Sequence, residues 1–327
     1  MKIGKMPGKK LEEIILNKIE YKRNDVLVHA GIGEDCSVVD LKNSLLVISS
    51  DPITGASKNA GYLAVHVACN DIAAAGAEPI GIQVILLLPE EVKEKEITNL
   101  MNEIIETAAV INVEVLGGHT EVLSAVNKPI ICVTAVGKVE KGEVRSSADA
   151  QPGDDLVVTK GVGIEGTYIL ANDYSDLLKD KGVSEDIIEE ALGYKNKLSV
   201  INESRIAVSY GAHALHDITE GGLYGALEEV SQAAGVGFDL YIDSLPISRE
   251  TGVISEALDI DPAGLISSGS MLIAVPESEK LINELKKQGI TAAKIGVLTE
   301  KEKNIIISGK KKAFVWPEKD ELWRLME

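Results

Sequence analysis

The segment GYLAVHVACNDIAAAG, residues 61–76, constrains the fold of this chain most strongly. It is rich in small residues and ends at Gly76, a pattern typical of a tightly packed helix that stops at a glycine. Asp71 lies among small and apolar neighbours, where a carboxylate without a partner is costly. We therefore expect a ligand-binding notch at Asn70 and Asp71. The alternative is a helix-face Asp that touches solvent or a backbone amide.

Apolar runs of strand length alternate with helical periodicity along the rest of the chain, which predicts an α/β fold. The polar stretch 146–155 contains Pro152 and Gly153 and separates two apolar strands, so we expect domains at 1–150 and 151–327. Helices are predicted at about 10–20, 61–76, 97–108, from 164, 184–193, 199–210, 221–234 and 278–288. Strands are predicted within 29–40, at 45–50, 82–88, 113–117, 129–139 and 155–159, within the strand and turn of 213–222, and at 236–242, 271–275 and 292–298.

Charge and cysteine usage exclude several classes of protein. The chain has 33 Lys and Arg against 51 Asp and Glu, a formal net charge of −18 that repels a nucleic-acid backbone. An anionic substrate would need metal ions or a few well-placed cations. Cys36, Cys69 and Cys132 are far apart, which argues against a disulfide framework or zinc knuckle and favours a reducing cytoplasm. No signal peptide and no membrane-spanning run is expected.

Acidic residues gather at strand ends and tight loops of the first predicted domain. Each taken alone is often only a turn former. Together, Asp35, Asp51, Asp71 and Glu121 supply four carboxylates attached to regular elements, and hard oxygen ligands of this kind suit Mg²⁺. Because Mg²⁺ accompanies polyphosphates, these residues point to a polyphosphate ligand.

Three glycine-rich segments are candidates for anion contacts. In GGHTE, 117–121, glycines follow a strand, although His119 is also explained as a surface or capping residue. The segment 159–166 contains GxGxxG, but no acid ends a strand about twenty residues later, so we infer only a phosphate contact at a helix start. HDITEGG, 216–222, is also explained by N-capping and a glycine turn. No P-loop, GxSxG or HExxH motif is present.

The ordered set GIGEDCSVVD, SSDPITG, AVHVACNDIAAAGAEP, GGHTEV, TKGVGIEGT and HDITEGGL resembles a known superfamily. Its members are aminoimidazole ribonucleotide (AIR) synthetase, thiamine-monophosphate kinase, selenophosphate synthetase and the hydrogenase maturation protein HypE. The resemblance covers about residues 28–300. It implies an N-terminal domain whose mixed sheet forms a dimeric barrel with a second subunit, and a C-terminal α/β sandwich domain. It also implies ATP between the domains, with Mg²⁺ on its phosphates.

The resemblance assigns roles residue by residue. Metal-binding residues are expected to be Asp35, Asp51, Asp71, His119 and Glu121. Residues that contact the nucleotide are expected to be Asn70, Gly117, Gly118, Thr120, Lys160, Gly161, Gly163, Gly221 and Gly222. The catalytic candidates are His216 and Asp217. Lys5 is a further catalytic candidate on separate grounds: the N-terminal GKMP segment would fold over the phosphates and supply a cation, and the alternative is a frayed terminus. His119 stands where relatives often have an acid, and imidazole suits Mn²⁺ better than Mg²⁺, so Mn²⁺ is an alternative metal.

The function implied is an ATP-dependent enzyme that activates an oxygen of a small molecule, amide or phosphate acceptor by phosphoryl transfer. The alternative is a nucleotide-binding maturation factor that acts with a partner protein and has no turnover of its own. HypE-type proteins end in a Cys that carries the carbamoyl group, whereas the last cysteine here is Cys132, and Glu220 stands where they usually have Arg. We expect a cytoplasmic homodimer of the HypE-like branch, with no carbamoyl carried on this chain.

Overall fold

The computed structural model describes residues 9, 12–13, 17, 24–29, 31–42, 44–53, 59–317 and 319–325. The helix expected at about 10–20 falls largely outside these residues, and the catalytic candidate Lys5 lies outside them. No helix in the described part of the chain is long and apolar enough to cross a membrane.

The first sheet has six strands in the order β1-β2-β3-β6-β4-β5. Its neighbouring strands run antiparallel except for β4 and β5, which are parallel, so the expected mixed sheet is confirmed. The strands are β1 (Val26–Val28), β2 (Ser37–Asp40), β3 (Leu45–Ile53), β4 (Glu78–Leu88), β5 (Glu114–Val122) and β6 (Ile130–Val139).

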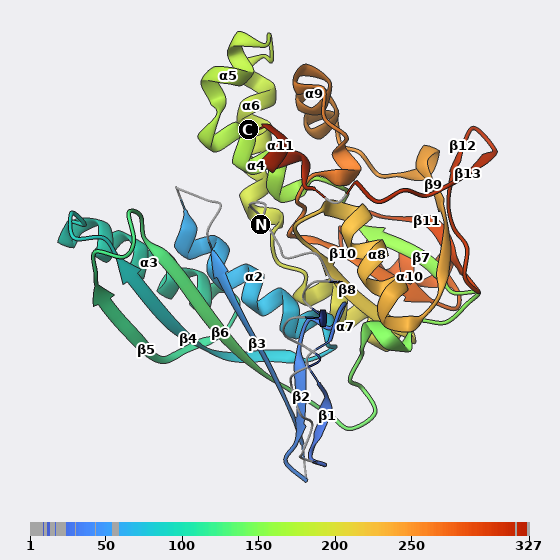
Figure 1. The fold of residues 1–327 in the computed structure, drawn as a ribbon, viewed down its shortest axis with the longest axis horizontal. Helices are drawn as coiled ribbons and strands as arrows, with labels where there is room; N and C mark the ends of the chain where they lie inside the picture. The colour runs from blue at the N-terminus through green and yellow to red at the C-terminus, as the bar shows by residue number, and fades with distance from the viewer. Residues whose placement is uncertain are drawn as a thin grey trace.

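Two helices, α2 (Ala60–Ala74) and α3 (Glu94–Val110), lie on one face of this sheet (Figure 1). α3 buries a single stripe that includes Ile104 and Ala108, as expected for a helix with one face in water. α2 is buried almost all round, because it packs on β3 and β6 on one side and on β8 and α7 on the other. The segment singled out by the sequence therefore joins the two halves of the molecule.

The second sheet has seven strands in the order β13-β12-β9-β11-β7-β10-β8. Only β12 and β9 are parallel within it. The strands are β7 (Asp155–Thr159), β8 (Ala214–Ile218), β9 (Gly237–Tyr241), β10 (Ser270–Val275), β11 (Ala292–Thr299), β12 (Lys303–Ile307) and β13 (Lys310–Ala313).

Helices cover both faces of the second sheet, which confirms the α/β expectation. α8 (Gly222–Ala234) packs on one face, and α7 (Ile201–Ser209), α10 (Ser278–Lys287) and the end of α2 pack on the other. The remaining helices share a separate core cluster beside the sheet (Figure 1). They are α4 (Ile164–Asp173), α5 (Ser175–Asp180), α6 (Glu185–Leu192), α9 (Arg249–Leu258) and α11 (Glu321–Leu325), joined by the 3₁₀ turn η3 (Gly193–Lys197).

Candidate functional site

Three acidic residues expected to bind metal come together where α2 meets β3. Ser49 and Asp51 point to the same face of β3, because side chains alternate along a strand. The Ser49 hydroxyl hydrogen-bonds to Asp71 Oδ2 and lies 3.3 Å from Asp51 Oδ2. Burial raises the pKa of Asp71 well above its usual value, and the charges of Asp217, Asp51 and Asp35 add to the effect. Asp35 also reaches this region, because its Oδ2 lies 2.9 Å from Nδ1 of His216, the residue before Asp217 in β8.

A fourth carboxylate, Asp217, enters this cluster from β8 in the second sheet. It is buried, and its Oδ2 has no hydrogen-bond partner among the residues that the structure describes. Burial, together with the charges of Asp35 and Asp51, raises the pKa of Asp217 to about 7, while the charge of His216 and a hydrogen bond with Asp71 oppose the rise. Asp35, Asp51, Asp71 and Asp217, named here the acid cluster, therefore draw on both halves of the molecule.

His216, next to Asp217 on β8, is held through both ring nitrogens. Nδ1 lies 2.9 Å from Asp35 Oδ2 and 3.2 Å from Ser147 Oγ, and Nε2 lies 3.1 Å from Glu229 Oε2. Burial alone would lower the pKa of His216, but Asp35 and Glu229 outweigh burial and raise it well above the usual value. A protonated, doubly engaged imidazole is suited to positioning Asp35 rather than to taking a proton from a substrate.

The chemistry of the acid cluster fits Mg²⁺ bound together with phosphates. Its donors are carboxylate oxygens, the ligands that Mg²⁺ prefers, and one of them is buried without a partner among the described residues. Within the described ranges, no group of three or more His, Cys, Asp or Glu side chains is arranged to hold a metal ion by itself. Mg²⁺ usually keeps waters and takes phosphate oxygens beside one or two carboxylates, so a site completed by its ligand is consistent with this arrangement.

The GGHTE segment, expected to follow a strand at 113–117, is instead part of edge strand β5 itself. Its expected metal residues His119 and Glu121 are exposed, and their side chains lie 3.6 Å apart. They pair in register with Ile85 and Leu87, whereas Asp51 shares a row with Val133, Val84 and Gly118. Adjacent rows point to opposite faces.

His119 and Glu121 therefore lie on the other face of the sheet from Asp51. Asp51 and Gly118 are also three strand spacings apart, or about 14 Å. Within one chain, the structure thus does not bring His119 or Glu121 to the acid cluster. Gly117 and Thr120, both expected to contact the nucleotide, lie in the same exposed strand. Packing alone explains the glycine at position 118, because a Cβ there would lie 1.8 Å from Val84 O.

Asn70 and Lys160, both expected to contact nucleotide, are already engaged with backbone atoms. Asn70 Nδ2 donates to Leu198 O at 2.8 Å, and Asn70 Oδ1 accepts from Val200 N at 3.0 Å. Lys160 Nζ donates to two backbone carbonyls and pairs with Glu203 Oε1 at 2.7 Å. The residue that completes this ion pair, Glu203, carries no sequence motif and was missed.

The glycine turns of the second half are also tightly packed. A Cβ at Gly161 would lie 2.8 Å from Pro246 O, and one at Gly222 would lie 2.6 Å from Ala263 O. Gly163 is left-handed and begins α4, while Gly221 N donates to Asp320 Oδ2 at 2.6 Å. These contacts explain the glycines without a ligand, and their expected nucleotide contacts stay predictions.

Several hydrogen-bond and ion-pair partners of the site residues were not predicted from the sequence. Ser49 stood in the quoted SSDPITG segment and was identifiable as a polar residue two positions from Asp51 on the same strand face. Ser147 and Glu229 carry no local signal, since they reach His216 only through the tertiary fold.

Two family models match this chain in tandem. The model described as AIR synthase related protein, N-terminal domain, matches residues 33–139, and the one described as AIR synthase related protein, C-terminal domain, matches residues 151–308. The chain belongs to the AIR synthase-related family. The acid cluster draws residues from both matched regions of this AIR synthase-related protein.

Among its relatives is a protein from Methanocaldococcus jannaschii whose name assigns it to hydrogenase expression or formation. The two are 28% identical over 94% of each chain. A carbamoyl dehydratase HypE from Rhodobacter capsulatus is 28% identical over 70% of this chain and 65% of that protein.

Solved structures share the fold of this AIR synthase-related protein. HypE in complex with ATP matches with a TM-score of 0.72 at 19% identity, covering 96% of this chain and 95% of that one. A ThiL complex with AMPPCP and TMP matches at 0.73 and 21% identity, covering 97% and 98%. A chain of a HypE–HypF complex matches at 0.73 and 20% identity, covering 95% and 100%.

Proposed function

We propose that this protein binds ATP with Mg²⁺ at the acid cluster and transfers a phosphoryl group to an oxygen of a small acceptor. The observation that carries the proposal is the meeting of Asp71 and Asp217, two buried carboxylates from different halves of the molecule. Buried like charges are costly unless a cation offsets them. That the structurally similar HypE and ThiL were solved with ATP or AMPPCP supports the choice of ligand.

The residues of this chain would bind the metal, position its ligands and accept a proton. Asp35, Asp51, Asp71 and Asp217 would hold Mg²⁺, which neutralises charge that develops on transferring phosphates. Ser49 fixes the Asp71 carboxylate by a hydrogen bond, and His216 orients Asp35. Asp217 also stays the candidate to accept the acceptor's proton, because burial raises its pKa to about 7 and one of its oxygens has no hydrogen-bond partner among the described residues.

The test is turnover of ATP with a panel of hydroxyl, amide and phosphate acceptors. We expect ADP to form with Mg²⁺ and one acceptor class, and Asp217→Asn to abolish it. The matched control is Asp40→Asn, a half-buried acid of the first sheet that pairs with Lys141 at 2.6 Å. Loss of turnover in both variants, or in neither, would contradict the role of Asp217.

A second candidate is a nucleotide-binding maturation factor that needs a partner protein. It is favoured by the 28% identity to a protein named for hydrogenase expression or formation, and by the HypE–HypF complex. ATP binding without turnover across the acceptor panel would favour this candidate over an independent enzyme.

We also propose a homodimer formed through the face of the first sheet that points away from α2 and α3. This face is open in the part of the chain that the structure describes (Figure 1). It presents half-buried and exposed apolar side chains, including Leu46, Ile48, Ile85 and Val136, as well as His119 and Glu121. His119 and Glu121 do not reach the acid cluster of their own chain, so any contact with an acid cluster would have to be with that of the partner in a dimer. We further propose that residues 1–150 and 151–327 are the two domains.

A further inference from the structure

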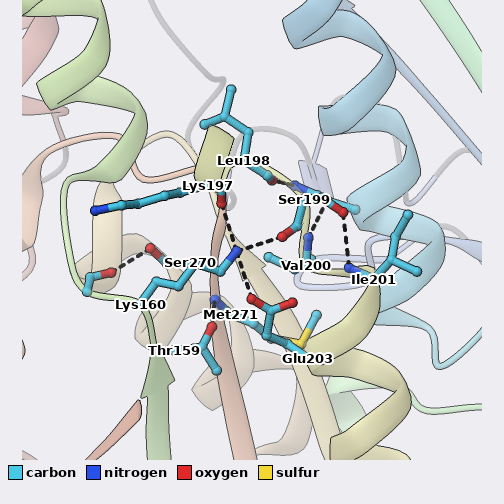
Figure 2. A network of polar contacts seen from close by, with 12 residues as sticks. Thr159, Lys160, Lys197, Leu198, Ser199, Val200, Ile201, Glu203, Ser270 and Met271 are labelled. Atoms are coloured by element: carbon cyan, nitrogen blue, oxygen red, sulfur yellow. Dashed lines mark hydrogen bonds and ion pairs between the residues drawn. The ribbon is translucent and has the colours of Figure 1, made fainter. Parts of the chain in front are cut away.

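The backbone of a four-residue segment, Lys197–Val200, is hydrogen-bonded by side chains from both halves of the molecule. From the second half, Lys160 Nζ donates to Lys197 O at 2.7 Å and to Ser199 O at 2.6 Å (Figure 2). From the first half, Asn70 bonds to Leu198 O and Val200 N. The two side chains thus use alternate peptide groups of this segment, which we name the strap.

The strap is anchored in the interior rather than at the surface. The side chains of Lys160 and Glu203 are 14% and 3% exposed, and Asn70 is fully buried. Glu203, from the first turn of α7, lies 2.7 Å from Lys160 Nζ and completes its set of acceptors (Figure 2). Lys160 also adopts a left-handed backbone with φ 59°, a conformation that a non-glycine residue keeps only when its surroundings demand it.

Both ends of this arrangement adjoin the acid cluster. Asn70 immediately precedes Asp71 on α2. Lys160 immediately follows Thr159, whose hydroxyl accepts from Met271 N at 3.1 Å, and Met271 stands directly opposite Asp217 in the β10–β8 pair. A chain of direct contacts therefore runs from Asp71 through the strap to Asp217.

We propose that Asn70 and Lys160 are positioning residues that set the spacing of Asp71 and Asp217 through the strap, and that neither contacts the nucleotide. The inference rests on the proposed function and gives these residues a different role from the ligand contacts expected from the sequence. All the hydrogen-bonding capacity that Lys160 would need for a phosphate is spent on two carbonyls and a carboxylate.

A double-mutant cycle on Mg-ATP affinity tests the inference, with Asn70→Ala, Lys160→Met and the double variant. Each single variant should weaken binding about 10–100-fold, as is typical when a group that orients metal ligands is removed. Because Asn70 and Lys160 both act through the strap, the double variant should lose no more Mg-ATP affinity than the single variant with the larger loss. Losses that multiply would mean two independent ligands and would overturn the inference.

Lys197→Met is the matched control. It removes a nearby positive charge whose Nζ lies 3.6 Å from the Tyr194 ring centroid, yet leaves the carbonyl that Lys160 uses. Affinity should stay within about twofold, well below the effect of Lys160→Met; equal losses would mean that Lys160 acts only as a charge, against the inference.

If Lys160→Met leaves Glu203 unpaired and fails to fold, Lys160→Met with Glu203→Gln removes both charges and takes its place in the cycle. Wild-type protein that binds no Mg-ATP would overturn the proposed function and this inference with it. Wild-type binding combined with multiplying losses would overturn this inference alone.

Discussion

The Asp35 carboxylate lies 2.9 Å from Nδ1 of His216, so an acid that precedes β2 of the first sheet is tied to a buried cation in β8 of the second. Glu229 holds the other ring nitrogen at 3.1 Å. The position of Asp35 in the acid cluster is thus set by the second half of the molecule.

His216→Asn should destabilise the protein by about 3–5 kcal/mol, because it leaves two partly buried carboxylates, those of Asp35 and Glu229, without their cation. The control is His213→Asn, since His213 also pairs with an acid, Asp154, at 2.9 Å but is about one-third exposed. It should cost about 1 kcal/mol or less. Urea denaturation measures both, and equal costs would contradict the role given to His216.

Asp71→Asn should weaken Mg-ATP binding and at the same time stabilise the protein without ligand. The substitution removes one charge from four crowded carboxylates, while an amide oxygen can still accept from Ser49. We expect a loss of affinity of about tenfold or more together with a higher melting temperature. Calorimetry and thermal unfolding check the two parts. A folded variant with unchanged affinity would remove Asp71 from the metal ligands.

The buried His66 should make stability depend on pH. Burial, followed by the charges of Lys160 and Lys195, lowers the pKa of His66 from 6.5 to about 4. Between these values the unfolded chain binds a proton that the folded protein does not, so stability falls as the pH falls through this window.

His66→Gln should therefore reduce the stability difference between pH 7 and pH 5 by about 2 kcal/mol. The exposed His119→Gln is the control and should leave the difference unchanged. Denaturant titrations at the two pH values provide the comparison. If His66→Gln and wild type keep the same pH dependence, His66 is not held neutral in the folded state.

The proposed dimer should dissociate when a charge is placed on the open sheet face. Ile85 is 40% exposed there, and Ile85→Lys should give a monomeric mass in analytical ultracentrifugation. Val110→Lys makes a similar change at the end of α3, where Val110 is 84% exposed, and should leave the dimer intact. A wild-type protein that is monomeric at all concentrations would contradict the dimer.

Much of the fold was predictable because its signals are local. The small-residue helix α2 and the alternating strand β6 follow from periods that are visible in a few residues. The hairpin of β12 and β13 was missed, since KNIII and KKKA carry no clean alternation and their burial is set by pairing at a sheet edge.

The site was predictable only where the chain itself carries the signal. Asp51 and Asp71 stand at a strand end and in an apolar helix, and the fold brings them together through Ser49. The face on which His119 lies depends on strand register, which a count along one strand does not fix. The engagement of Lys160 depends on a segment about forty residues away in the chain.

Binding of ATP to the acid cluster through a metal can be measured by isothermal titration calorimetry with Mg²⁺, with Mn²⁺ and with a chelator. We expect one ATP per chain with either metal, no binding in the chelator, and loss of binding in Asp217→Asn. His119 lies on the sheet face opposite Asp51, so His119→Asp should shift the metal preference toward Mg²⁺ only if a dimer brings this residue to the partner's acid cluster. No binding heat with either metal, or an affinity unchanged by the chelator, would show that the acid cluster does not bind ATP through a metal.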